Sequence, residues 1–190
     1  MARSSGDRVS KLRQQHLDAR RHMTDAERSA ASDSINRQLL RSRSYARANS
    51  IGVYLATADE VDLDAFIHTA WLHKKRVYAP RVAQNREMFF LELSRDTRII
   101  RNRYGIWEPD EGTAVSPRSL DWIIVPMVAF DSANHRIGMG GGYYDRALSF
   151  AKHRHPDLPP RLTGVAFACQ ESTDFAANPW DIGVSSVVRA

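Results

Sequence analysis

Two patterns of apolar and polar residues follow one another along the chain, one typical of helices and one of buried strands. Residues 9–22 predict a first helix with few apolar positions. A second helix is predicted from Thr24 to about Tyr45, because Thr24 and Glu27 have the spacing of a capping box. Three apolar residues at helical spacing form its inward face, Ala31, Ile35 and Leu39. The first part of the chain is therefore expected to be helical.

Two further segments have a helical pattern. A third helix is expected to begin at Asp62 or Asp64, since either side chain could cap it. Four apolar residues give this helix an inward face, namely Phe66, Ile67, Ala70 and Trp71. A last helical segment is predicted over residues 144–153.

Short apolar runs that do not alternate with polar residues are typical of strands buried on both faces. These runs are residues 51–55, 76–79, 88–93, 122–125, 162–168 and 184–188. Because helical segments separate several of these runs, we predict one α/β domain over residues 1–190. It is expected to have a three-layer α/β/α arrangement with a mostly parallel, Rossmann-like sheet and a helical N-terminal arm. Ligands of such sheets bind beyond the carboxyl ends of strands. The loops after Leu55, Phe130 and Ala168 are therefore the places to look for a site.

Composition narrows the class of protein. The single cysteine, Cys169, cannot form an internal disulfide, and its place after an apolar run predicts a buried rather than a reactive thiol. Residues 1–30 contain no apolar stretch typical of a signal peptide. No run approaches the roughly 18 apolar residues that span a bilayer. We therefore expect a cytoplasmic protein that does not cross a membrane.

Positive charge is concentrated at the start of the chain. The net charge is +5, and residues 1–50 hold eleven Lys or Arg against five Asp or Glu. Such a basic arm attracts anions, whether nucleotide phosphates, an acidic small molecule or nucleic acid. The arm lacks interleaved aromatic residues and contains no nucleic-acid recognition motif, so a nucleic-acid-binding protein is the weaker alternative.

The most informative segment is RIGMGGGYYDR, residues 136–146. Each of its four glycines would weaken a helix or strand by roughly 0.5–1 kcal/mol relative to alanine. Glycine admits positive φ and lets a ligand approach closely, so successive amides can form an anion-binding nest. Arg136 and Arg146 flank the segment, and the helix expected from Tyr144 adds its positive end. We predict a phosphate-binding loop here rather than a flexible surface turn.

The segment differs from the two best-known phosphate-binding motifs. It lacks the Gly-Lys-Ser/Thr of a Walker A loop, and its spacing does not fit the dinucleotide fingerprint. Asp145 follows the glycines directly, and a carboxylate beside bound phosphates is usually bridged by Mg²⁺. Asp181 could be a second carboxylate, although by itself it fits a helix or turn cap.

RIGMGGGYYDR, preceded by DWIIVPMVAFD and followed by NPWDIGVSSVV, resembles the 5-formyltetrahydrofolate cyclo-ligase (5,10-methenyltetrahydrofolate synthetase) family. Other parts of the chain resemble the family more weakly and occur in the family's order. They are LR at 12–13, RRHMTDAER, IGVYLATADEVD, RVYAPRV, MFFLEL and YGIWEP. The likeness covers most of the chain, and the glycine-rich segment is its specific part. This resemblance implies that the protein closes 5-formyltetrahydrofolate and its polyglutamates to 5,10-methenyltetrahydrofolate. The reaction would require Mg²⁺ and would convert ATP to ADP and phosphate.

The resemblance also implies roles for individual residues. ATP would contact Arg13, Arg136, Ile137, Gly138, Met139, Gly140, Gly141, Gly142, Tyr143 and Tyr144. The folate would contact Leu55, Glu60, Trp107, Met139, Gly140, Gly141, Gly142 and Tyr143, with Trp107 stacked on the pterin ring. Asp145 and Asp181 would hold Mg²⁺, and Arg136, Arg146 and Tyr143 would assist the reaction. We expect a monomer or a weak dimer.

One position departs from the family pattern. Val9 stands where the family usually has a lysine, four residues before Arg13. Lys11 and Arg8 are the nearest replacements for an ATP contact, but a helix turns about 100° per residue, so neither occupies the same place. This leaves open a family relative that binds ATP or folate without turning them over.

Overall fold

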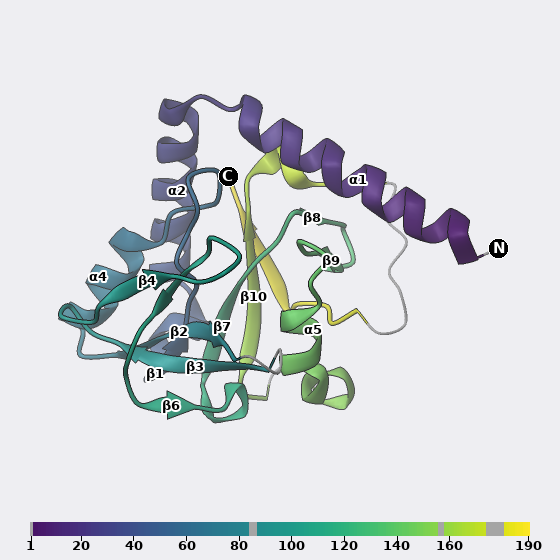
Figure 1. Ribbon diagram of the computed structural model, residues 1–190. Coiled ribbons are helices and arrows are strands. Elements are labelled where there is room, and N and C mark those ends of the chain that lie inside the picture. Colours follow the sequence, from purple (N-terminus) through teal and green to yellow (C-terminus); the bar gives the residue numbers. More distant parts are fainter. Residues whose placement is uncertain (1, 84–86, 156–157, 174–180) are drawn as a thin grey trace.

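A mixed central sheet runs through the computed structural model, which describes residues 2–83, 87–155, 158–173 and 181–190 (Figure 1). Its seven strands lie in the order β11–β10–β7–β1–β2–β3–β6. Their bounds are β1 Ser50–Gly52, β2 Arg76–Val82, β3 Met88–Leu93, β6 Ala114–Val115, β7 Trp122–Pro126, β10 Arg161–Ala166 and β11 Ser186–Arg189. Pairings from β11 across to β2 are parallel, whereas β2–β3 and β3–β6 are antiparallel. The prediction of a mainly parallel sheet is confirmed.

Helices and two small hairpins surround this sheet. The α-helices are α1 Ala2–His22, α2 Asp25–Leu40, α3 Arg43–Arg47, α4 Asp64–Leu72 and α5 Tyr143–Ala147. Three 3-10 helices are described, η1 Pro117–Ser119, η2 Ser149–His153 and η3 Ala168–Gln170. The hairpins are β4 Ile99–Arg101 with β5 Trp107–Pro109, and β8 Ala129–Phe130 with β9 Arg136–Ile137. Helix α1 crosses the top of the molecule, and its N-terminal end points away from the body (Figure 1).

The side chains of β7 show how the sheet divides the core into two apolar clusters. Trp122 and Ile124 belong to the cluster that includes residues of α2 and α4. Ile123 and Val125 belong to the other cluster, which includes Leu148 beside α5. Full burial of each such side chain stabilises the folded protein by roughly 1.5–3 kcal/mol. Apolar residues on both faces explain why the strand does not alternate with polar positions, and they confirm the layered α/β arrangement.

The helices differ from their predicted bounds in ways that have local causes. The capping box at Thr24 is confirmed, because its side chain accepts from the Glu27 amide while Glu27 binds the Thr24 amide. The helix ends at Leu40, not near Tyr45, since Ser42 caps a separate helix, α3, by accepting from the Tyr45 amide. The prediction that Asp62 or Asp64 caps α4 is wrong, because Leu63 is the N-cap residue and makes no side-chain cap hydrogen bond; the Asp62 carboxylate accepts from the amide of Asp64, the first residue of the helix.

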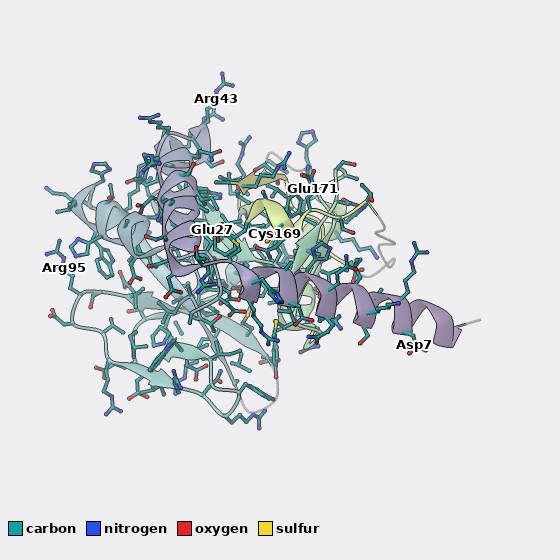
Figure 2. All side chains as sticks on the ribbon, turned by 90° about the horizontal axis from the view of Figure 1, so that it is seen from above. Asp7, Glu27, Arg43, Arg95, Cys169 and Glu171 are labelled. Atoms are coloured by element: carbon teal, nitrogen blue, oxygen red, sulfur yellow. The ribbon has the colours of Figure 1, made fainter. Side chains whose placement is uncertain are left out.

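Segment ends were predicted less well than the segments themselves. The run at 51–55 is regular strand only as far as Gly52, and the run at 162–168 stops at Ala166 and turns into η3. The helix expected over 144–153 divides into α5 and η2. Because η3 turns the chain to the surface, Cys169 is exposed and not buried, contrary to the prediction. Figure 2 shows Cys169 beside α1.

Candidate active site

The glycine-rich segment forms a loop between β9 and α5. Gly140 and Gly142 have positive φ, 93° and 63°, which a side chain would strain. Gly142 is also the residue that precedes the first turn of α5. Because α5 has only five residues, its dipole is weaker than the predicted longer helix would provide. The loop therefore depends on its own backbone and on neighbouring arginines.

Two arginines hold the loop by its carbonyl groups. Arg13, on α1, donates from Nε to the Gly138 carbonyl at 2.8 Å, across 125 residues of sequence. A Cβ on Gly140 would lie 3.3 Å from the Arg13 Cζ, so this guanidinium lies directly against the loop. Arg146 donates from Nη2 to the Gly141 carbonyl at 3.0 Å. Both arginines thus place positive charge at the loop, as the sequence predicts.

Arg136 occupies a different position, beneath the loop. Its side chain is 3% exposed, and Nη2 donates to Asp145 Oδ1 at 2.7 Å. Its Nε is buried and has no hydrogen-bond partner among the described residues. Asp145 Oδ1 also accepts from the Ile182 amide at 3.4 Å, which brings the segment that holds Asp181 to the start of α5. The Arg136–Asp145 pair therefore connects the loop to a distant part of the chain.

Tyr144 directs a buried hydroxyl toward the loop that follows β1. Its ring is partly exposed, but the hydroxyl is buried and unpartnered within the described residues. Burial and the nearby Glu60 carboxylate raise the pKa of Tyr144, against the opposing charge of Arg136. Burial and Glu60 likewise raise the pKa of Tyr54, whose hydroxyl donates to the Val61 carbonyl at 2.6 Å. Glu60, Tyr54 and Tyr144 therefore lie close together although three segments supply them.

Helix α1 also fixes the loop after β1. Arg20 is buried and donates from Nη2 to Asp59 Oδ2 at 2.8 Å. Burial works to raise the pKa of Asp59, but its bonds and charge interaction with Arg20, with help from Thr57, hold it below the ordinary value. The same Thr57 donates to Glu60 Oε2 through its amide and its hydroxyl, both at 2.9 Å. Arg20 and Asp59 were not predicted from the sequence, where the only signal is an arginine within a pattern of buried positions.

An aromatic surface lies next to the glycine-rich loop. The Tyr104 ring, at the turn of the β4–β5 hairpin, is centred 6.0 Å from the Tyr143 ring. Trp107 is 37% exposed and Met139 is 65% exposed. Exposed apolar side chains grouped around a polar loop are typical of a binding surface. A planar ligand could therefore stack beside the loop.

A cavity of about 400 Å³ lies between α2 and the loop after β1, and its lining also includes Glu60, which approaches the glycine-rich loop through Tyr144. Its lining includes the carboxylates of Asp25, Asp33, Asp62 and Asp64, with Arg28 as its only basic residue among those described. Negative charge of this kind repels phosphates and carboxylates. The glycine-rich loop, which combines arginines with aromatic rings, is the better candidate for an anionic ligand.

A model of the 5-formyltetrahydrofolate cyclo-ligase family matches residues 6–190. The chain belongs to this family. It is thus an enzyme of the ligase class, and the family suggested by the glycine-rich segment is confirmed.

Relatives of the family come from several bacteria. A 5-formyltetrahydrofolate cyclo-ligase of Haemophilus influenzae is 29% identical over 173 residues, covering 89% of this chain and 90% of the relative. One from Escherichia coli K12 is 34% identical over 147 residues, or 74% and 78% of the two chains. The solved 5,10-methenyltetrahydrofolate synthetase of Aquifex aeolicus has a TM-score of 0.81 at 30% identity, covering 95% and 89%. That of Mycoplasma pneumoniae has a TM-score of 0.75 at 26% identity, covering 95% and 97%.

The structure brings most of the residues suggested by the cyclo-ligase resemblance to one region, and leaves others apart. Arg13, Arg146 and the segment 136–145 meet directly, and Glu60 approaches them through Tyr144. Val9 packs with Leu12, Ala129 and Ile137, at the base of the loop. Lys11 is exposed, and because it lies two residues from Arg13 it points about 200° away around α1. Its contact with ATP therefore remains a prediction with little geometric support.

Two other residues that the resemblance assigns to the site are Leu55 and Asp181. Leu55 is partly buried beside the cluster that contains α2 and α4. Asp181 is described, but Pro179 and Trp180 of the same sequence block lie outside the described residues. Among the residues described, none of the helices is long and apolar enough to cross a membrane.

Proposed function

We propose that this chain closes 5-formyltetrahydrofolate to 5,10-methenyltetrahydrofolate, converting ATP to ADP and phosphate in the presence of Mg²⁺. The observation that carries the proposal is the glycine-rich loop held by Arg13 and Arg146, in a chain that matches the cyclo-ligase family over residues 6–190. Polyphosphate binding suits the loop because guanidinium groups and free backbone amides neutralise phosphate oxygens.

The folate would occupy the aromatic surface beside the loop. Trp107, Met139 and Tyr143 supply exposed apolar area, and Glu60 supplies a carboxylate for the polar edge of a pterin. Among the described residues the buried Tyr144 hydroxyl has no hydrogen-bond partner, and it lies near Glu60. A pterin at this place would satisfy a polar group that is otherwise costly to bury.

The reaction needs the formyl oxygen of the folate next to the terminal phosphate of ATP. Oxygen attack on the phosphorus gives ADP and a phosphorylated formyl group, which the neighbouring folate nitrogen attacks at carbon. That nitrogen loses its proton, and phosphate leaves with the former formyl oxygen. Phosphoryl transfer depends on positioning and charge neutralisation more than on covalent help. Arg13, Arg146 and the loop amides would hold the phosphates in line with the formyl oxygen.

Mg²⁺ would be held by Asp145 and Asp181. The described residues contain no cluster of three or more metal-binding side chains. Two carboxylates suit Mg²⁺ nonetheless, since this ion usually takes its other ligands from phosphate oxygens and water. When bound, it would neutralise charge on the phosphates. The chain's own part is to orient Asp145, which Arg136 and the Ile182 amide fix in place.

The proposal is tested by following formation of the methenyl chromophore from 5-formyltetrahydrofolate. We expect product only when ATP and Mg²⁺ are both present, with one ADP released per turnover. Binding of ATP and folate without product under any condition would instead support a relative that has lost turnover. Salt-sensitive binding of bulk RNA without product would support the nucleic-acid alternative.

We also propose that residues 1–190 form a single domain that acts in the cytoplasm on folate polyglutamates as a monomer or a weak dimer. The continuous central sheet supports the first part, because strands from both halves of the chain pair within it.

A further inference from the structure

Two turns of the chain contain the same arrangement of a threonine and a glutamate three residues apart. At the start of α2, Thr24 donates to Glu27 Oε2 through its amide at 2.7 Å and its hydroxyl at 2.8 Å. In the loop after β1, Thr57 donates to Glu60 Oε2 through the same two groups, both at 2.9 Å. The first arrangement caps a helix, whereas the next helix after Glu60, α4, begins only at Asp64. The second arrangement therefore fixes a glutamate side chain without capping a helix.

Glu60 is held through only one of its two carboxylate oxygens. Both hydrogen bonds from Thr57 end on Oε2, and no residue that the structure describes donates to Oε1. The carboxylate also lies near Tyr54 and Tyr144, where burial is the main cause of a raised pKa and the charge of Glu60 adds to it. Because Glu60 is partly exposed, its Oε1 is left for a ligand, near the buried Tyr144 hydroxyl.

A buried ion pair holds the turn that contains Thr57. The Thr57 hydroxyl lies 3.0 Å from Asp59 Oδ1 and 2.9 Å from Glu60 Oε2, and its single proton can go to only one of them at a time. Asp59 Oδ2 already accepts from the buried Arg20 at 2.8 Å. Because this cation neutralises Asp59, the hydroxyl proton is attracted more strongly by Glu60. The Arg20–Asp59 pair thereby leaves the Thr57 hydroxyl to Glu60.

A carboxylate oxygen with a fixed position is a good acceptor for the N–H groups at the pyrimidine edge of a pterin. We propose that Thr57 is a positioning residue for folate binding, which fixes Oε2 of Glu60 so that Oε1 is presented to these N–H groups. Asp59 and Arg20 support Thr57 in this role. The inference rests on the proposed function, because it takes the folate to bind at Glu60.

The expected effect follows from side-chain freedom. A glutamate has several rotatable bonds, and immobilising such a side chain on binding weakens an affinity by about two- to tenfold. Thr57 removes this cost in advance, since Glu60 is already held in the unliganded protein. Loss of the Thr57 hydroxyl should therefore weaken folate binding while leaving the nucleotide contacts of Arg13 and Arg146 unchanged.

The test measures the Kd of 5-formyltetrahydrofolate by calorimetry, with a non-hydrolysable ATP analogue and Mg²⁺ present. Thr57→Val removes the hydroxyl and keeps both the amide and the branched shape. We expect the folate Kd to rise about fivefold, whereas the Kd of the ATP analogue should change by less than about twofold. In turnover, the folate KM should rise with kcat within about twofold of the wild-type value, because a binding contact is lost and not a catalytic one.

Three further variants separate positioning from a general structural effect. Thr57→Ser keeps the hydroxyl, so its folate Kd should stay within about twofold of wild type. Thr24→Val breaks the matching arrangement at the start of α2, where Glu27 lies (Figure 2), and should lower stability without changing the folate Kd. Glu60→Ala removes the carboxylate itself, so adding Thr57→Val to it should have no further effect on the folate Kd.

Four results would overturn the proposal: an unchanged folate Kd in Thr57→Val, an equal loss in Thr57→Ser, an equal loss in Thr24→Val, or the same loss when Glu60 is alanine. If urea unfolding shows that Thr57→Val does not fold, Thr57→Ala removes the same hydroxyl with less bulk and is held to the same expectations. If the wild type binds the folate without turnover, the proposed function fails, and the Kd comparison still decides the role of Thr57. No binding of 5-formyltetrahydrofolate by the wild type would contradict the inference.

Discussion

Asp145 connects the glycine-rich loop with the segment that contains Asp181. Its carboxylate accepts from the buried Arg136 and from the Ile182 amide, and it follows the glycine-rich loop directly. Both hydrogen bonds go to Oδ1, so the carboxylate is held in place beside the position proposed for Mg²⁺. A substitution of Asp145 should lower turnover without unfolding the protein only if the new side chain has the same shape as aspartate.

Asp145→Asn keeps the shape and removes the charge. We expect turnover to fall at least about 100-fold, because the metal site loses one of its two carboxylates. The unfolding free energy should fall by only about 1–2 kcal/mol, since an amide oxygen can still accept from Arg136. Steady-state rates and urea unfolding measure the two effects, with the exposed Asp96→Asn as a control. Full activity in Asp145→Asn would remove this residue from the metal site.

Gly140 and Gly6 allow the same substitution to be compared in two settings. Gly140→Ala adds a Cβ at φ 93° and 3.3 Å from the Arg13 Cζ, so we expect a loss of about 1–2 kcal/mol in unfolding free energy and a higher KM for ATP. Gly6 lies in α1 with nothing within 4 Å, and Gly6→Ala should stabilise the helix by about 0.5–1 kcal/mol. Equal effects in the two variants, measured by urea unfolding, would show that the loop conformation imposes no special requirement.

At the scale of the element, one carboxylate reinforces the backbone pairing between β1 and β7. Asp121 accepts from the amides of Asn49 and Ser50, both at 2.8 Å, and from the Ser50 hydroxyl at 2.9 Å. Partial burial works to raise the pKa of Asp121, but these hydrogen bonds outweigh it and lower the pKa below its ordinary value. These hydrogen bonds align β1, which is the strand that leads to the loop after Leu55.

The lowered pKa gives this contribution a defined pH dependence. The stabilisation is complete above the unfolded pKa of about 3.9 and is lost as pH falls through the lower, folded pKa. Asp121→Asn should cost about 1–2 kcal/mol at pH 7, and the difference from wild type should shrink as the pH falls below about 3.9. Denaturant unfolding at several pH values tests this. A difference that stays constant down to low pH would mean that the charge of Asp121 contributes nothing.

The elements that the sequence predicts well are those with a long or distinctive local signal. Residues 88–93 form β3 as predicted, and Thr24 with Glu27 marks the start of α2. The hairpins β4–β5 and β8–β9 were not predicted, because strands of two or three residues are too short to show a period. Tyr104 was missed for the same reason, since only the hairpin turn brings it to Tyr143.

The candidate site was predictable in part. Glycines at 138 and 140–142 and their flanking arginines are adjacent in sequence, so the loop could be recognised from its composition. Arg20 and Asp59 come from distant segments, and their ion pair arises only when α1 packs over the loop after β1. Cys169 was wrongly expected to be buried because an apolar run does not reveal where the strand turns away from the core.

At the scale of the whole molecule, Arg20 and Asp59 hold the N-terminal helix to the sheet. The Arg20 side chain is 4% exposed, so Asp59→Asn would leave a buried cation without a charged partner. We expect a loss of about 3 kcal/mol in unfolding free energy, still in one cooperative transition if residues 1–190 form one domain. Glu171→Gln breaks the exposed pair with Arg189 and should cost less than about 1 kcal/mol. Two separate transitions, by fluorescence and circular dichroism, would contradict the single-domain prediction.

Some partners of helix α1 lie far from it in the sequence. Its Arg13 binds a carbonyl 125 residues further along, and His16 donates to the carbonyl of Cys169, 153 residues away, at 2.9 Å. During synthesis on the ribosome the pair of Arg20 with Asp59 can form early, but the contacts of Arg13 and His16 cannot form until residues 138 and 169 have emerged. The glycine-rich loop gains its contact with Arg13 only at that stage, so incomplete chains released early would lack the proposed nucleotide site.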